Sequence, residues 1–451
     1  MPLTLSPPES RLSGIIFFGL LALPPLIAIP YGGGDQWWMS LFQAFTFFLA
    51  ALWSIDGAAT GHWFTLSHLL AIPAAAFVLY VFLQSYIVSP DPYETRLAAA
   101  QFLALTTYGV LLLRYVNSER RLKALVLIVV IVGCASSMFG LARIGGQSGD
   151  AAFVLPALTR GQGFAQFLNK NHFAFLAEMS LGLLLGILAG RGVQRERRLA
   201  YFLFCLLLWA AVVLSNSRGG ILAILCQIVF FVLTFGAIHD RGPNDEDVPG
   251  NRLLILIQHS IFIKIALAIM LLACISVGAV WLGGEPLADR IAHVNEEMTS
   301  PEQDQTDTSR VAIWRATLKM FRGHPIFGTG FGAYLDSITE YHQGNGNLIP
   351  YQAHNDYLEL LAAGGIPAIL LFFTFGAMLI RFAISRLTTG TMFERSACLG
   401  ALVGLFAISV HSVFDFGLHI TINAVVFVSL VVIATAVPKP AVIQKTMPSK
   451  H

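Results

Sequence analysis

Long apolar stretches alternate with short polar segments along most of the chain. A helix needs about 20 mainly apolar residues to cross the hydrocarbon core of a bilayer, and these stretches have about that length. Gly and Pro interrupt many of them, which bundles of membrane helices tolerate. The pattern predicts about twelve transmembrane helices, near residues 13–31, 37–54, 64–86, 97–116, 122–142, 171–190, 199–215, 219–237, 262–282, 366–384, 397–414 and 420–436.

The composition agrees with this interpretation. Only 12% of the 451 residues are charged and 56% are hydrophobic, and the mean hydropathy is +0.69. Because a soluble globular protein carries about 25% charged residues, the shortage of charge excludes a soluble multidomain protein, a disordered chain and a nucleic-acid-binding protein. We therefore expect an all-α, polytopic integral membrane protein.

Basic residues set the expected orientation. Four Lys or Arg residues lie at 114–123 and four more at 191–198, and both segments fall on the same side of the predicted helices. Cytoplasmic loops carry an excess of Lys and Arg. The termini then lie in the cytoplasm, and residues 284–365 form one large loop on the outer side.

This large loop is expected to be partly helical. Thr308-Ser309 can cap a helix that runs to Arg322, because apolar residues recur at helical spacing, at Val311, Trp314, Leu318 and Phe321. A glycine-rich turn follows at 328–332. A second helix, which begins near His354, leads through Gly364-Gly365 into the tenth predicted span.

Arg218 is the first candidate functional residue. It lies in Ser215-Asn216-Ser217-Arg218-Gly219-Gly220, a tight turn between two spans on the outer side. A guanidinium in such a place is a functional hypothesis by default, and the glycines allow a ligand to approach closely. The alternative is an arginine that anchors a helical hairpin at the membrane interface.

Arg310 and Arg315 lie on the predicted loop helix. An Arg in the first turn of an amphipathic helix at the membrane surface can bind a lipid diphosphate through bidentate hydrogen bonds. The alternative for both residues is an ordinary solvated or acid-paired arginine, since acidic partners are plentiful in this loop. Arg310 shares a helix face with Trp314, whereas Arg315 projects elsewhere.

His354, beside Asn355 and Asp356, is the candidate proton acceptor, because histidine is suited to this role near neutral pH. A lone loop histidine can equally be structural. Farther along, His411, Asp415 and His419 are spaced so that they could ligate a metal, but the pattern favours hydrogen bonds between helices. The five cysteines lie in apolar stretches without Cys-x-x-Cys spacing, so no metal site is expected from them either.

Taken together, four ordered pieces resemble the O-antigen ligase and polymerase superfamily, bacterial membrane enzymes that transfer lipid-linked glycans. The resemblance is firmest over residues 160–375. The pieces are Gly163-Phe164 with Asn169-x-Asn171-His172-Phe173-Ala174; Ser215-x-Ser217-Arg218-Gly219-Gly220; Ser309-Arg310-x-x-x-Trp314 with His324-Pro325-Ile326-Phe327-Gly328-x-Gly330; and His354-Asn355-x-Tyr357-Leu358-Glu359 with Gly364-Gly365-Ile366.

The resemblance implies a GT-C-like glycosyltransferase in the bacterial inner membrane, with its active site facing the periplasm and with no nucleotide, metal or other cofactor. The donor would be a glycan on undecaprenyl diphosphate. The acceptor would be a sugar hydroxyl, on lipid A–core for a ligase or on another lipid-linked glycan for a polymerase. Membrane lipid would surround the chain.

The resemblance also assigns roles. Arg218 and Arg310 would neutralise the departing diphosphate and His354 would orient the acceptor hydroxyl or take its proton, with inversion at the anomeric carbon. Secondary substrate contacts would come from Lys170, Asn171, Arg160 and Arg315. The chain would divide into N-terminal helices (1–160), a ligase-like core that includes the periplasmic loop 284–365 (161–375), and C-terminal helices with a cytoplasmic tail (376–451).

A transporter is the competing interpretation, moving either a lipid-linked oligosaccharide or a small anion. It would place ionisable residues deep within several spans. The centres of the predicted spans are nearly free of charge, and the unusual polar residues gather at the outer face. This distribution favours an enzyme that acts at the membrane surface.

Overall fold

A computed structural model describes residues 10–64, 66–144, 163–239, 310–342 and 350–437. Within these ranges the chain forms helices and no strand. The α-helices are α1 (Arg11–Ala28), α2 (Gln36–Thr60), α3 (Ala71–Ile87), α4 (Pro92–Tyr115), α5 (Glu119–Ile144), α6 (Lys170–Ala189), α7 (Arg198–Ser215), α8 (Arg218–His239), α12 (Arg310–Gly323), α13 (Tyr334–Ile338), α14 (Asp356–Thr389), α15 (Met392–His411) and α16 (Thr421–Thr435).

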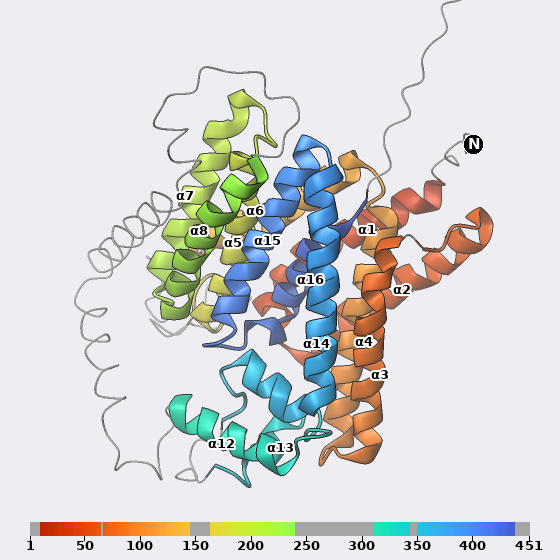
Figure 1. Ribbon diagram of the computed structural model, residues 1–451, viewed down its shortest axis with the longest axis vertical. Coiled ribbons are helices and arrows are strands. Elements are labelled where there is room, and N and C mark those ends of the chain that lie inside the picture. Colours follow the sequence, from red (N-terminus) through yellow and green to blue (C-terminus); the bar gives the residue numbers. More distant parts are fainter. Residues whose placement is uncertain (1–9, 65, 145–162, 240–309, 343–349, 438–451) are drawn as a thin grey trace, which may run out of the picture.

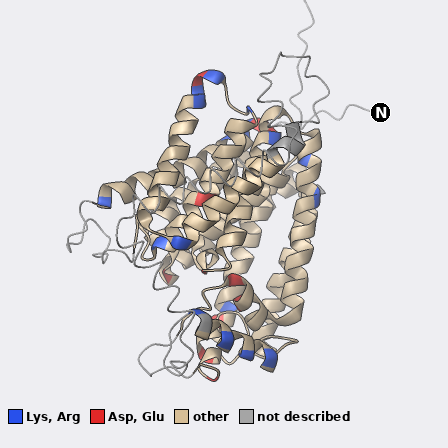
Figure 2. Ribbon diagram, turned by 60° about the vertical axis from the view of Figure 1, so that its left-hand side comes forward, with Lys and Arg blue, Asp and Glu red and all other residues tan. Residues whose placement is uncertain are grey.

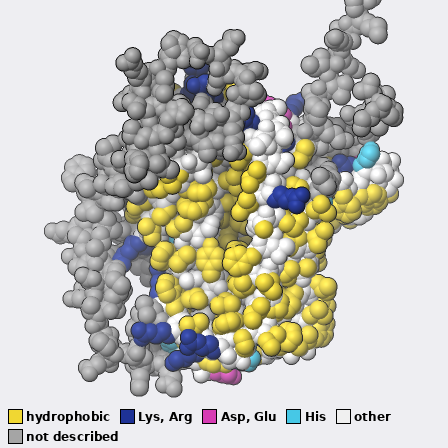
Figure 3. Space-filling model, in the orientation of Figure 1, with side chains coloured by type: hydrophobic (Ala, Val, Ile, Leu, Met, Phe, Trp, Pro, Cys, Tyr) yellow, Lys and Arg dark blue, Asp and Glu magenta, His cyan; other side chains and the backbone are white. Residues whose placement is uncertain are grey.

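The described part of the chain contains 9 helices that are long and apolar enough to cross a membrane, and the shorter apolar helices Arg218–Thr234 and Thr421–Thr435. Together they coincide with every predicted span except 262–282, which lies outside the described residues. Hydrophobic side chains cover much of the surface of this bundle (Figure 3). Among the described residues, most Lys and Arg positions lie near the ends of its helices or between them (Figure 2). These features confirm a polytopic helical membrane protein.

Helices α6 and α15 pack backbone against backbone through pairs of glycines. A Cβ atom added at Gly186 would lie 2.1 Å from the backbone nitrogen of Gly400, and one added at Gly182 would lie 2.4 Å from that of Gly404. Each helix therefore presents a Gly-x-x-x-Gly stripe to the other, and small residues of this kind let membrane helices approach closely. This contact fixes the two helices whose outer ends carry site residues.

A break in α14 divides it into a short outer helix and a membrane-spanning helix. Gly365, with φ of 62°, is the non-helical residue at this break. The glycine-rich turn packs directly against it, because Gly330 N donates to Ala363 O (2.9 Å) and a Cβ at Gly328 would lie 2.2 Å from that same oxygen. From α3, Tyr80 Oη also donates to the carbonyl of Gly364 at 2.7 Å. The predicted turn therefore holds the start of α14 in place.

Helices α12 and α13 lie beyond one end of the bundle, next to the outer part of α14 (Figure 1). The predicted loop helix is confirmed as α12. The helix buries Ile313, Ala316, Thr317 and Met320. Thr317 Oγ1 lies 2.6 Å from Tyr334 Oη on α13, so a polar residue is satisfied inside the contact.

Candidate functional site

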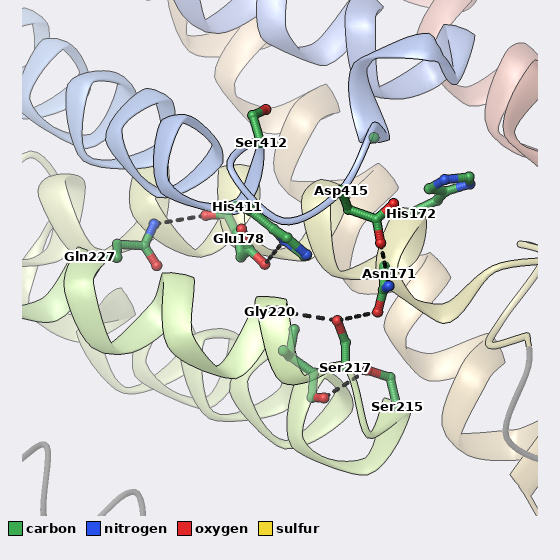
Figure 4. Close-up of polar contacts among 12 residues, drawn as sticks. Asn171, His172, Glu178, Ser215, Ser217, Gly220, Gln227, His411, Ser412 and Asp415 are labelled. Carbon is green, nitrogen blue, oxygen red and sulfur yellow. Dashed lines mark hydrogen bonds and ion pairs between the residues drawn. The ribbon is translucent and has the colours of Figure 1, made fainter. Parts of the chain in front are cut away.

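A buried carboxylate, Asp415, joins four parts of the chain at one end of the bundle. It lies between α15 and α16, and its side chain is 1% exposed. His354 Nδ1 lies 3.3 Å from Asp415 Oδ1, and Arg310 Nη2 lies 3.5 Å from Oδ2. Asn171 Nδ2 donates to Oδ2 (Figure 4), and the backbone nitrogen of Phe416 donates to Oδ1 at 2.9 Å. We call Asp415, His354, Arg310 and Asn171 the Asp415 cluster.

Charge in this cluster fixes which nitrogen of His354 carries a proton. Burial raises the pKa of Asp415, but the hydrogen bond from His354 and the charges of Arg310 and His172 outweigh it and hold that pKa well below its usual range. An ionised carboxylate only accepts hydrogen bonds, so Nδ1 of His354 must donate. In the neutral imidazole, the lone pair is then on Nε2. The His354 side chain is 33% exposed, and its Nε2 makes no hydrogen bond within the described residues.

The backbone holds His354 in a conformation that few residues adopt. Its φ is 48°, in the left-handed region. On one side, Asn355 caps α14 by accepting from the backbone nitrogens of Tyr357 and Leu358. On the other side, the backbone nitrogen of Ala353 donates to Glu359 at 2.9 Å. These bonds offset the strain and fix the imidazole in place.

A second polar group lies directly behind His354. His419 Nε2 lies 3.3 Å from Glu359 Oε1 and 3.7 Å from Asp356 Oδ1. The ring of Phe416 separates the two groups, with centroids 4.8 Å from His354 and 5.9 Å from His419. Both histidines thus contact one aromatic ring, with His354 facing Asp415 and His419 facing Glu359 and Asp356.

A chain of hydrogen bonds links the Asp415 cluster to the start of α8 (Figure 4). Ser217 Oγ donates to Asn171 Oδ1 at 2.7 Å, and the backbone nitrogen of Gly220 donates to Ser217 Oγ at 3.2 Å. Arg218 is the next residue along the chain and its side chain is exposed. Within the described part of the protein it has no hydrogen-bond or ion-pair partner.

The structure brings together three of the seven predicted site residues, His354, Arg310 and Asn171, around Asp415. Lys170 is half-buried at the first position of α6, next to Asn171, and Arg218 lies at the first position of α8.

The other two predicted residues lie apart from this cluster or cannot be placed. Arg315 is exposed on α12 and does not share the contact of Arg310 with Asp415. Arg160 lies outside the described residues.

Sequence reasoning did not assign Asp415 a role in the site. One signal was present: Asp415 is the only acidic residue in 396–451, and it falls between two apolar spans. The expectation of hydrogen bonds between helices is confirmed for His411, whose Nδ1 lies 2.8 Å from Glu178 Oε1 on α6. His419, farther along the chain, instead faces the carboxylates of Glu359 and Asp356. Among the described residues, no group of three or more His, Cys, Asp or Glu side chains is arranged to hold a metal.

The fold and the site together define a polytopic helical membrane protein. One end of its helical bundle carries a polar site that contains an imidazole and a guanidinium. Residues 203–373 match the O-antigen ligase family. This match includes Arg218, Arg310 and His354, and it confirms the resemblance to the O-antigen ligase and polymerase superfamily. It indicates a membrane protein that handles glycans in the manner of that family. No curated protein matches the chain.

Proposed function

We propose that this protein is a glycosyltransferase that moves a glycan from undecaprenyl diphosphate to a sugar hydroxyl at the periplasmic face of the inner membrane. The observation that carries the proposal is the Asp415 cluster, in which one buried carboxylate faces both His354 and Arg310. A base and a guanidinium side by side are what this transfer requires: one takes a proton, and the other meets the negative charge of the leaving group.

His354 acts as the general base. Its Nδ1 donates to Asp415, so its Nε2 accepts the proton of the acceptor hydroxyl as that oxygen attacks the anomeric carbon. The bond between the anomeric carbon and the phosphate oxygen breaks, and its electron pair leaves with the diphosphate. Asp415 stabilises the imidazolium that forms, as a buried carboxylate does for other catalytic histidines.

Arg310 and Arg218 neutralise the diphosphate. Arg310 is 45% exposed, so part of its guanidinium is available to a ligand while Nη2 faces Asp415. Arg218 is exposed at the start of α8, where backbone amides favour an anion. With two guanidinium groups in this role, the reaction needs no metal ion. Diphosphate is itself the leaving group, and the reaction therefore needs no nucleotide.

The same geometry supports a single displacement with inversion. A retaining enzyme needs a carboxylate that can reach the anomeric carbon. Asp415 is buried and its oxygens already contact His354, Arg310, Asn171 and the backbone of Phe416. This carboxylate is engaged and cannot act as the nucleophile.

Other assignments follow the position of each residue. Both amide atoms of Asn171 are engaged, by Asp415 and Ser217, so we assign it to positioning Asp415 in place of the substrate contact expected from the sequence. Lys170 and Arg315 are assigned as secondary contacts to the substrate. Arg160 lies outside the described residues, and its assignment as a substrate contact rests on the sequence alone. The ligase-like core 161–375 holds most of the site, but Asp415 extends it into the segment 376–451.

The test compares steady-state kinetics of purified variants. His354→Ala should lower kcat about 100-fold or more, because it removes the base, while the KM for the lipid donor changes little. Arg310→Ala should mainly raise the donor KM. Movement of the lipid across a bilayer with no new glycosidic bond would contradict the proposal and favour a flippase.

A further inference from the structure

A second polar pair lies inside the bundle next to the Asp415 cluster, since the backbone nitrogen of Asp415 donates to the carbonyl of His411 at 3.1 Å. Glu178 on α6 and His411 on α15 are both fully buried, and Oε1 of the first lies 2.8 Å from Nδ1 of the second (Figure 4). Burying two ionisable side chains costs free energy that apolar side chains would avoid. The proposed transfer uses neither residue. Glu178, near the middle of α6, is an exception to the expectation that the span centres are nearly free of charge.

Three helices meet at this pair. The ring of Phe175, from α6, stacks on His411 with centroids 4.2 Å apart. From α8, Gln227 Nε2 donates to the backbone carbonyl of Glu178 at 2.9 Å. The imidazole is thus fixed in orientation as well as in position.

The free nitrogen of His411 is aimed at the first turn of α8. Its Nε2 has no hydrogen-bond partner within the described residues. A Cβ atom added at Gly219 would lie 2.5 Å from this nitrogen, so the imidazole rests against the glycine and leaves no room for a side chain. On the opposite side, a Cβ atom at Gly220 would lie 2.6 Å from Cβ of Ala174 on α6. The first turn of α8 is therefore held between α15 and α6, and Arg218 begins it.

We propose that Glu178 and His411 are a positioning pair, which fixes the first turn of α8 and, through it, the guanidinium of Arg218 for a lipid diphosphate. This inference rests on the proposed function, in which Arg218 meets the donor. A guanidinium on a rigid helix end binds an anion better than one on a loose end, because less conformational entropy is lost on binding. The hydrogen bond from Nδ1 to Glu178 keeps the ring from turning away from Gly219.

The test measures the Kd of the purified protein for undecaprenyl diphosphate. Glu178→Leu frees the imidazole, and Gly219→Ala pushes the first turn of α8 away from His411 while both members of the buried pair are still present. Each should raise the Kd about tenfold or more, because the guanidinium of Arg218 is then no longer preorganised for the diphosphate. Glu178→Gln keeps an oxygen that accepts from Nδ1 and should restore binding to within about twofold. Gly14→Ala is the matched control, because nothing lies within 4 Å of its added Cβ.

A double-mutant cycle separates positioning from general stability. If the pair acts through Arg218, Glu178→Leu should weaken binding in the wild-type background and add nothing in an Arg218→Ala background. An equal effect in both backgrounds, or none in either, would overturn the inference. This test measures binding, so its failure can be distinguished from failure of the proposed function. The proposed function fails if the wild-type protein binds the lipid yet forms no glycosidic bond.

Discussion

Replacing Asp415 with Asn would remove the negative charge that faces His354 and Arg310 while the side chain keeps its size. Nδ1 of His354 would lose its fixed acceptor, so the imidazole would populate the wrong tautomer. We expect kcat for glycan transfer to fall about 100-fold or more, measured at saturating donor and acceptor. Asp336→Asn, at an exposed position of α13, should leave the rate unchanged. An Asp415→Asn protein that keeps more than half of the wild-type rate would refute the role of this carboxylate.

The same residue predicts a dependence of stability on pH. Because the pKa of Asp415 lies below its usual range, its ionised form favours the folded state. That contribution is complete above the pKa of an unfolded Asp, about 3.9, and is lost as the pH falls through the folded pKa. The difference in thermal midpoint between the wild type and Asp415→Asn, measured in detergent, should be constant from pH 5 to 8 and shrink below about pH 4. A difference that grows on acidification would be the opposite of this prediction.

At the residue scale, the sequence allowed three members of the Asp415 cluster to be predicted, but not the carboxylate that connects them. His354 stands out as a base and Arg310 as a cation in the large loop that the sequence predicts on the outer side. Asp415 lies 61 residues from His354 and 244 from Asn171 along the chain. Only the packing of α6, α14 and α15 brings these residues together, and a local pattern does not contain that information.

At the scale of the elements, the glycine stripe between α6 and α15 gives a sharp prediction. An Ala at position 186 would place Cβ 2.1 Å from the backbone of α15, which cannot move aside as a side chain can. Overpacking of this kind costs about 1–3 kcal/mol, so Gly186→Ala should lower the thermal midpoint in detergent. Gly376→Ala, where nothing lies within 4 Å of the added Cβ, should leave it equal or higher, because Ala favours a helix by up to about 1 kcal/mol. Equal midpoints for the two variants would contradict close packing here.

Hydropathy predicted the helices well, because the length and apolarity of a span are local properties. Which face of a helix is buried is not local. The contact of α12 with α13 includes the polar residue Thr317, which hydrogen-bonds Tyr334, and hydropathy alone does not indicate such a contact. The Gly-x-x-x-Gly stripes on α6 and α15 were present in the sequence, but which helices they join is settled only by the whole bundle.

For the whole molecule, the distribution of Lys and Arg predicts which end faces the cytoplasm. The turn between α6 and α7 is rich in Arg, whereas α13 lies with the Asp415 cluster at the other end of the bundle (Figure 1). A membrane-impermeant maleimide should label Asp336→Cys in intact spheroplasts, and should label Glu196→Cys only after the membrane is opened. The unsubstituted chain gives the background, and Cys134, Cys205 and Cys398 are buried. The reverse pattern of labelling would place the site in the cytoplasm.

The central claim is that the protein forms a glycosidic bond at the Asp415 cluster, and product analysis tests it most directly. Purified protein would be incubated with a glycan on undecaprenyl diphosphate and with sugar acceptors, and the products followed by mass spectrometry. We expect the wild type to give the acceptor enlarged by the mass of the glycan together with free undecaprenyl diphosphate, and His354→Ala to give neither above background. Equal product from both proteins, or no product from the wild type with either lipid A–core or a second lipid-linked glycan as acceptor, would contradict the account.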